Sequence, residues 1–187
     1  MNPNPTFAQV GRAAPDFNLA STKDLATLES PVRLSDYAGR WLVLVFYPLD
    51  FTFVCPTELR ALSERYHDFR REEADVLAVS ADSVFCHRAW IEAPAERGGL
   101  GPVNYPLASD PLGRVAQAYG SWSYDGDHPL RGTFLIDPKG VLRAATVYDA
   151  DVGRSVDETL RSLAAFKTGG LCPIDWKPGQ ATLSAGA

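Results

Sequence analysis

Cys55 is the residue whose type and position most directly indicate chemistry. It stands between an apolar run, Trp41–Tyr47, and the segment Cys55-Pro-Thr-Glu58, which predicts a helix start because proline and acidic residues suit the first turn. Unpaired N–H groups and the helix dipole at such an end favour a thiolate over a thiol. The alternative is a cysteine that serves packing alone. We expect a reactive thiolate at Cys55, with the Thr52 hydroxyl available to the sulfur or to a substrate oxygen.

The other two cysteines differ in context. Glu58 occupies the second position of a would-be Cys-x-x-Cys motif, so a disulfide within the motif is excluded. Cys172 lies in a tail rich in Gly and Pro and is the candidate redox partner of Cys55, within one chain or between two. Cys86 precedes His87 on a predicted helix, where neighbours point about 100° apart and form no catalytic pair. We expect Cys86 to serve packing.

The remaining ionisable candidates are less specific. His67 and His128 lie in unrelated contexts and lack the spacing of zinc ligands, so we predict no metal site. Arg131 precedes a predicted strand, and from there its guanidinium can reach Cys55 and favour the thiolate, although an exposed arginine is the common alternative. Arg154 precedes a predicted helix cap, and its sequence context leaves the same two alternatives open.

Hydrophobic periodicity places these residues on alternating strands and helices. Strands are predicted at 41–47, 75–80, 132–136 and 141–148, and helices at 55–69, 83–93, 110–119 and 155–167. This order predicts an α/β fold with a mixed sheet covered by helices, in one domain over residues 1–168. Residues 169–187 are predicted to form an irregular C-terminal arm that carries Cys172.

Composition narrows the functional classes. The chain has 187 residues, a formal net charge of −5 and a sequence pI near 5.2, which argue against a nucleic-acid partner. The longest apolar run, 41–47, is far shorter than the ~18 residues of a membrane span. The first residues lack a basic and apolar signal segment, so we expect a cytoplasmic protein. In that compartment cysteines are more often catalytic, redox-active or metal-bound than structural.

Together the motifs resemble a known family. The segment Phe46-Tyr-Pro48-Leu-Asp-Phe-Thr52-Phe-Val-Cys55-Pro-Thr-Glu58 is similar to the active-site signature of peroxiredoxins. It most resembles the typical two-cysteine branch, which includes the peroxidase component of bacterial alkyl hydroperoxide reductase. Further matches, from about Phe7 to Gly179, are Val79-Ser-Ala-Asp-Ser83, His87-Arg-Ala-Trp90, Gly98-Gly-Leu-Gly101, Arg131-Gly-Thr-Phe-Leu-Ile-Asp137, Val152-Gly-Arg-Ser-Val-Asp-Glu-Thr-Leu160 and Cys172-Pro-Ile-Asp-Trp-Lys-Pro-Gly179.

The resemblance implies a thioredoxin-like fold and a peroxidase without haem, metal or other cofactor. Cys55 matches the peroxidatic cysteine, whose thiolate attacks a hydrogen peroxide or organic hydroperoxide and becomes a sulfenic acid. The remaining matched positions are Pro48, which shields the pocket; Thr52, which hydrogen-bonds the peroxide; Arg131, which stabilises thiolate and oxyanion; and Glu58 and Arg154, which orient Arg131.

The resemblance also implies partners. Cys172 matches the resolving cysteine, which condenses with the sulfenic acid of the partner subunit after local unwinding of the Cys55 helix. The expected reductant is a thioredoxin-like dithiol or the flavoprotein of alkyl hydroperoxide reductases, and the expected assembly is a homodimer or a decamer of dimers. A holdase chaperone is the alternative from another class. A protein thiol–disulfide oxidoreductase is disfavoured by Glu58.

The chain departs from the family pattern in two places. Gly98-Gly-Leu-Gly101 resembles a motif of members that are sensitive to overoxidation, which pair it with an aromatic C-terminal helix. The residues after Gly179 include no aromatic residue, so we expect easy unwinding at Cys55 and resistance to overoxidation. Cys86 stands where the family usually has serine or threonine.

Overall fold

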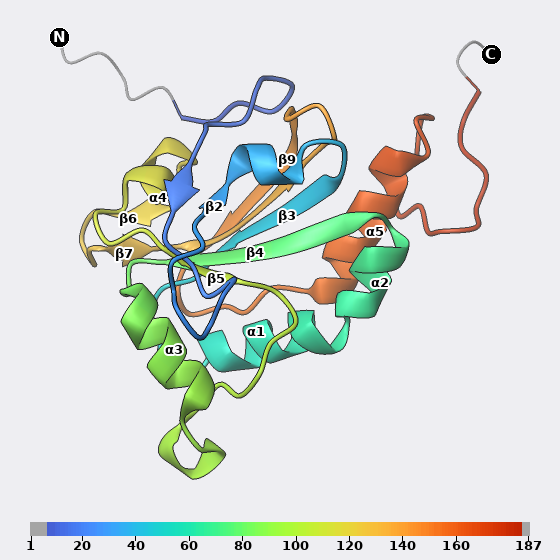
Figure 1. Cartoon of the computed structure of the whole chain (residues 1–187). Helices are drawn as coiled ribbons and strands as arrows, with labels where there is room; N and C mark the ends of the chain where they lie inside the picture. The colour runs from blue at the N-terminus through green and yellow to red at the C-terminus, as the bar shows by residue number, and fades with distance from the viewer. Residues whose placement is uncertain (1–6, 185–187) are drawn as a thin grey trace, which may run out of the picture.

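A five-stranded mixed sheet forms the centre of the computed structural model, which describes residues 7–184 (Figure 1). The strand order is β5-β4-β3-β8-β9. These strands are β3 (Trp41–Phe46), β4 (Ala74–Ser80), β5 (Leu107–Ser109), β8 (Arg131–Ile136) and β9 (Leu142–Tyr148). β3, β4 and β5 are parallel, whereas β8 and β9 are antiparallel to their neighbours. The predicted mixed sheet is confirmed.

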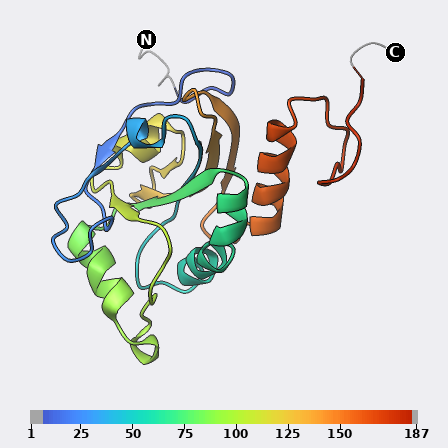
Figure 2. The same cartoon turned by 45° about the vertical axis from the view of Figure 1, so that its right-hand side comes forward.

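Helices cover both faces of this sheet (Figures 1 and 2). They are α1 (Cys55–Glu64), α2 (Tyr66–Arg71), α3 (Val84–Glu92), α4 (Arg114–Ala118) and α5 (Val156–Lys167), with short 3-10 helices η1 (Leu34–Tyr37) and η2 (Ala95–Arg97). Two small antiparallel pairs complete the order: β1 (Asn18–Leu19) with β2 (Val32–Arg33), and β6 (Trp122–Ser123) with β7 (His128–Pro129). These short strands were not predicted, because two residues show no periodicity.

The central strand β3 separates two hydrophobic cores. All six of its residues are buried, and successive side chains point to opposite faces. Val43 and Val45 belong to the core under α1, α2 and α5. Leu42 and Leu44 belong to the core under α4 and the N-terminal segment. This burial on both sides explains why the run has no polar alternation.

Two predicted helices differ from the observed ones. The helix expected over 55–69 is interrupted at Arg65, whose backbone leaves helical geometry (φ −96°, ψ 10°). The Arg65 side chain bonds Asp68 and Asp157, and α2 follows in a new direction beside β4. The helix expected over 110–119 is restricted to α4, because residues 110–113 form a turn that needs the positive φ of Gly113 (62°).

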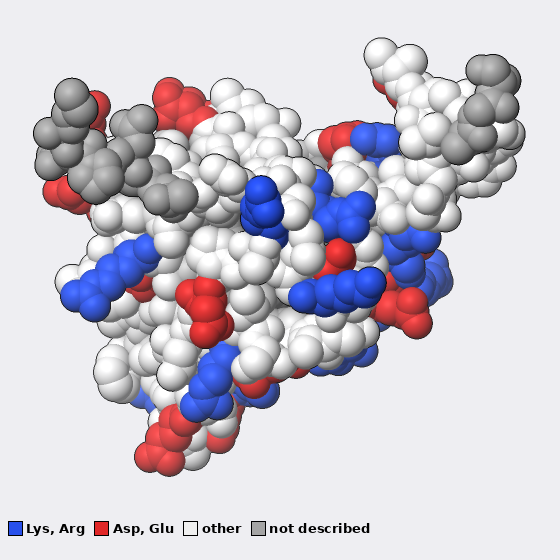
Figure 3. Space-filling model, turned by 90° about the horizontal axis from the view of Figure 1, so that it is seen from above, with Lys and Arg blue, Asp and Glu red and all other residues white. Residues whose placement is uncertain are grey.

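The chain beyond α5 leads away from the sheet in both views (Figures 1 and 2). Residues 169–184 contain no helix or strand, as predicted, although Trp176 in this segment is buried. The face seen in Figure 3 carries basic and acidic side chains intermixed, without a large area of one sign. None of the helices within residues 7–184 combines the length and apolar character needed to cross a bilayer.

Candidate active site

Cys55 lies where strand β3 has ended and α1 begins. The strand is followed by buried Pro48 and by a loop that ends at Val54, whose carbonyl accepts hydrogen bonds from the N–H groups of Thr57 and Glu58. Cys55 is the first helical residue and Pro56 is the second. Its side chain is almost fully buried, with 1% exposed. The sulfur therefore sits at the positive end of a helix, away from bulk water.

Arg131 contacts this sulfur directly. Its Nη1 lies 3.5 Å from Cys55 Sγ, and its Nε donates to the Ala150 carbonyl at 2.6 Å. Strand direction explains the meeting: β8 is antiparallel to β3, so the start of β8 lies at the edge of the sheet where β3 ends. The guanidinium is buried, and the register of β8 against β3 fixes its position.

Glu58 joins two arginines beneath the sulfur. Its Oε2 accepts from Arg131 Nη1 at 2.7 Å, and its Oε1 accepts from Arg154 Nε at 2.9 Å. Burial opposes the charged carboxylate, but the hydrogen bonds and charge of Arg154, followed by the charge of Arg131, outweigh it and lower the pKa of Glu58. Glu58 is therefore a carboxylate at neutral pH and holds both guanidiniums in place.

Arg154 is itself anchored in the body of the sheet. Its backbone N–H donates to Glu58 Oε1 at 2.8 Å, and its Nη1 donates to the carbonyls of Phe46 and Gly132, both at 2.8 Å. With two guanidiniums and one carboxylate, the cluster has a net charge of +1 beside Cys55. In a site of low polarity this charge favours an anion, either a thiolate or an oxygen that gains negative charge.

The structure thus brings Arg131, Glu58 and Arg154 together around Cys55. Thr52, in the loop before α1, is half-buried, and its hydroxyl donates to the Leu49 carbonyl at 2.9 Å. That bond turns the hydroxyl toward its own loop.

Cys172 lies in a different part of the molecule, beyond α5. Its Sγ is 3.6 Å from the Ala165 carbonyl oxygen and 3.5 Å from Thr168 Oγ1, and both Cys172 and Cys55 are free thiols. The segment that carries Cys172 projects away from α1 in both views (Figures 1 and 2). Within this one chain, the Cys55 and Cys172 sulfurs are not brought together.

Comparison with known proteins assigns the family. The AhpC/TSA family model matches residues 10–145. The chain belongs to the AhpC/TSA family. It is 52% identical over 180 residues to peroxiredoxin-2 of Macaca fascicularis, with 94% of this chain and 90% of that protein covered. It is 49% identical over 174 residues to a protein of Clostridium pasteurianum named as a putative peroxiredoxin in its rubredoxin operon, with 93% and 98% covered.

Solved structures agree with this assignment. The reduced 2-Cys peroxiredoxin of Plasmodium vivax superposes with a TM-score of 0.88 at 34% identity, over 92% of this chain and 91% of that chain. AhpC of Enterococcus faecalis superposes with a TM-score of 0.79 at 31% identity, over 89% of this chain and 100% of that chain. The fold is thioredoxin-like, as predicted. The protein is a peroxiredoxin, a thiol-dependent peroxidase.

This peroxiredoxin also contains a buried polar network that the sequence did not reveal. His87, fully buried on α3, places Nδ1 2.7 Å from Asp50 Oδ2, while Tyr47 donates to Asp50 Oδ1 at 2.8 Å. The Asp50 N–H donates to Asp82 Oδ2 at 2.9 Å. The network joins the loop before Cys55 to α3. The residues are up to 40 positions apart and follow no motif spacing, so no sequence signal links them.

Cys86 lies at the edge of this network, in the first turn of α3. Burial, then the charges of Asp50 and Asp82, raise the pKa of the Cys86 thiol to about 12. Within residues 7–184, Asp50, Asp82 and Cys86 are the one group of three whose potential ligand atoms lie within 4.8 Å of one another. Asp50 is already satisfied by His87 and Tyr47, and the thiol is protonated at neutral pH.

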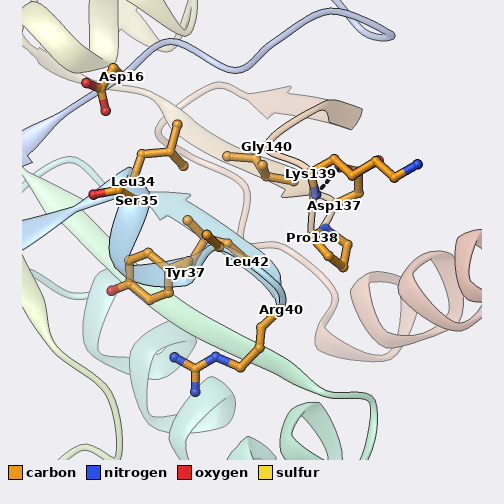
Figure 4. A pocket seen from close by; sticks show the side chains of 12 residues that line it. Asp16, Leu34, Ser35, Tyr37, Arg40, Leu42, Asp137, Pro138, Lys139 and Gly140 are labelled. Atoms are coloured by element: carbon orange, nitrogen blue, oxygen red, sulfur yellow. Dashed lines mark hydrogen bonds between the residues drawn. The ribbon is translucent and has the colours of Figure 1, made fainter.

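A cavity of about 290 Å³ lies at the opposite end of β3 from Cys55 (Figure 4). Leu42, near the start of β3, lines it together with Leu34, Tyr37 and Ile136. Because α1 follows the other end of the same strand, this peroxiredoxin's cavity is separate from the Cys55 site.

Proposed function

We propose that Cys55 is the residue that reacts with peroxide. Its thiolate attacks one oxygen of the O–O bond, the S–O bond forms as the O–O bond breaks, and the leaving hydroxide or alkoxide takes up a proton. Cys55 is oxidised to a sulfenic acid and the peroxide is reduced to water or alcohol. The observation that carries the proposal is the buried Cys55 sulfur 3.5 Å from the Arg131 guanidinium.

The charges around the sulfur have separable roles in this proposal. Arg131 first stabilises the thiolate. It then stabilises the negative charge that develops on the leaving oxygen, and in a buried site this second effect is the larger of the two. Glu58 and Arg154 are positioning residues that hold Arg131 through the bonds described above. Thr52 lies in the loop before α1, and its hydroxyl turns from the Leu49 carbonyl toward the peroxide when substrate binds. Buried Pro48 shields the pocket.

We propose further that Cys172 of a second subunit resolves the sulfenic acid. The Cys172 sulfur attacks the Cys55 sulfur, a disulfide forms and water leaves. A disulfide requires Cα atoms within ~7 Å, so the first turn of α1 must unwind to bring the buried Cys55 out. The solved relatives named as 2-Cys peroxiredoxins support a mechanism with two cysteines. A thioredoxin-like or flavoprotein dithiol then reduces the disulfide.

Surface apolar residues support an assembly of subunits. Phe51 is 47% exposed and Phe53 is 93% exposed in the loop before Cys55, and Phe85 at the start of α3 is 65% exposed. Beyond α5, Leu171 and Ile174 are 56% and 92% exposed on either side of Cys172. Large exposed apolar side chains in two regions fit two kinds of contact, as a decamer built from dimers requires. A cytoplasmic location fits three free cysteines.

Three variants test these roles. Peroxide consumption is measured with a thioredoxin system for the wild type, Cys55→Ser and Cys172→Ser, with Cys86→Ser as the matched cysteine control. Cys55→Ser abolishes activity. Cys172→Ser still forms the sulfenic acid but no disulfide-linked dimer on a non-reducing gel, and Cys86→Ser behaves as wild type.

The assignment of Cys55 is refuted if Cys55→Ser keeps full activity. Normal turnover of Cys172→Ser with thioredoxin refutes the resolving role and favours a mechanism with one cysteine.

A further inference from the structure

The second turn of α1 is tied to a neighbouring segment by an arginine outside the charged site. Arg60 Nε donates to the Leu100 carbonyl at 3.0 Å, and its Nη2 donates to the Gly99 carbonyl at 2.5 Å. Arg60 itself is exposed, whereas Leu100 is buried. One planar guanidinium thus spans two successive carbonyls, a geometry that lysine cannot reproduce.

The segment that receives these bonds is itself bonded to α3. Trp90, fully buried on α3, donates from Nε1 to the Gly98 carbonyl at 2.9 Å, and its own carbonyl accepts from the Leu100 N–H at 2.8 Å. A Cβ added at Gly99 would overlap the Ala93 carbonyl oxygen, so the backbone there is in close contact. Arg60 therefore ties α1 to a segment that α3 holds in place.

A second bond acts on the same turn. Tyr105, a buried residue that follows this segment, donates its hydroxyl to the Leu59 carbonyl at 2.6 Å. The two halves of α1 are consequently held by different partners. The first turn, which carries Cys55, is held by the charges at Glu58, and the turn after it is held by Arg60 and Tyr105.

We propose that Arg60 is a positioning residue that keeps the Cys55 helix wound and thereby slows disulfide formation. This inference rests on the proposed function, in which α1 unwinds before Cys172 reacts. The Cys55 sulfenic acid has two fates. Attack by the Cys172 thiol gives a disulfide and water and needs the unwound helix. A second peroxide transfers oxygen to the sulfur, giving sulfinic acid and water or alcohol, and needs the wound helix.

Arg60 therefore sets the ratio of these two fates without touching the peroxide. The effect opposes the resistance to overoxidation that the sequence predicts, because a tie on the second turn limits how far unwinding spreads. Loss of two hydrogen bonds from a partly exposed guanidinium corresponds to a rate change of about three- to tenfold.

The test is Arg60→Met, which keeps much of the side-chain length and removes every donor. Stopped-flow tryptophan fluorescence separates the reaction with peroxide from disulfide formation, and mass spectrometry measures Cys55 sulfinic acid at rising peroxide. We expect disulfide formation to accelerate about fivefold and the peroxide needed for half overoxidation to rise by the same factor. The reaction with peroxide changes less than about twofold on the same scale. Arg60→Lys lies between wild type and Arg60→Met.

Arg97→Met is the matched control, because Arg97 is exposed, adjoins Gly98 and has no side-chain bond within residues 7–184. It leaves both rates and the overoxidation profile at wild-type values. Tyr105→Phe removes only the hydroxyl and gives an independent variant, with the same direction of change as Arg60→Met, should the latter fold poorly. Circular dichroism establishes folding in each case.

Two results overturn the inference in distinguishable ways. If the wild type forms the Cys55–Cys172 disulfide, but Arg60→Met and Tyr105→Phe form it at the wild-type rate or more slowly, the positioning role is wrong and the proposed function stands. If the wild type forms no such disulfide at all, the proposed function fails and the inference fails with it.

Discussion

Replacing Glu58 with glutamine removes the negative charge between two buried guanidiniums. Glutamine keeps the shape of the Glu58 side chain, but an NH2 group replaces one of the two carboxylate oxygens. That NH2 group then faces N–H donors of Arg131 or Arg154. Removing one partner of a buried ion pair costs about 3–5 kcal/mol, and the remaining amide oxygen keeps part of the bonding. We expect the free energy of unfolding to fall by about 3 kcal/mol at pH 7.

The pH dependence of this loss follows from the lowered pKa of Glu58. Burial raises the pKa, but the bonds and charges of Arg154 and Arg131 bring it below the ordinary 4.5. A carboxyl whose pKa is lower in the folded state adds stability that is fully present above its unfolded pKa. That stability is lost as the pH falls through the folded pKa. The difference between wild type and Glu58→Gln therefore shrinks below pH 4.5.

Urea unfolding at one fixed protein concentration, from pH 7 down to the lowest pH at which both proteins are folded, measures this difference. Glu158→Gln is the control, because Glu158 is 54% exposed in its ion pair with Arg161 and such pairs contribute about 0–1 kcal/mol. A loss below about 1 kcal/mol for Glu58→Gln at pH 7, or one that is the same at every pH, refutes the reasoning.

Three further predictions concern single residues. Arg131→Lys keeps the charge but loses the guanidinium fork, in which Nη1 donates to the Cys55 sulfur and the Glu58 carboxylate while Nε donates to the Ala150 carbonyl. The rate constant with peroxide in stopped-flow assays therefore falls about hundredfold. Gly99→Ala lowers the melting temperature in calorimetry, because a Cβ there would overlap the Ala93 carbonyl oxygen. Cys86 reacts slowly with iodoacetamide at pH 8, because its raised pKa of about 12 keeps the thiol protonated. Peptide mass spectrometry measures the labelling of Cys86, whose rate rises about tenfold per pH unit.

The central elements were predictable because their signals are local. The uninterrupted apolar run at 41–47 marks a strand buried on both faces, and β3 occupies 41–46. Pro56 and Glu58 mark the start of α1 because a helix end needs no N–H at its first positions and favours negative charge there. Ser155 caps α5 by accepting from the Glu158 N–H, as the sequence pattern indicated.

Features that depend on contacts between distant segments could not be predicted from the sequence. At the break between α1 and α2, Arg65 bonds Asp157, which is 92 residues away. The meeting of Asp50 and His87 depends on how a loop lies against α3. For Arg131 the sequence offered a place at a strand start, but its contact with Cys55 depends on the antiparallel register of β8, which no single segment encodes.

The wide separation of the site residues has a consequence for the newly made chain. Arg131 follows Cys55 by 76 residues, and Arg154 follows Glu58 by 96. At ordinary rates of translation the chain from Cys55 to Arg154 takes about 5–20 s to synthesise. Throughout that interval Cys55 is present in an unfinished sheet, without the complete pair of guanidiniums. The charged site around Cys55 is therefore complete only once β8 and the segment before α5 have joined the fold.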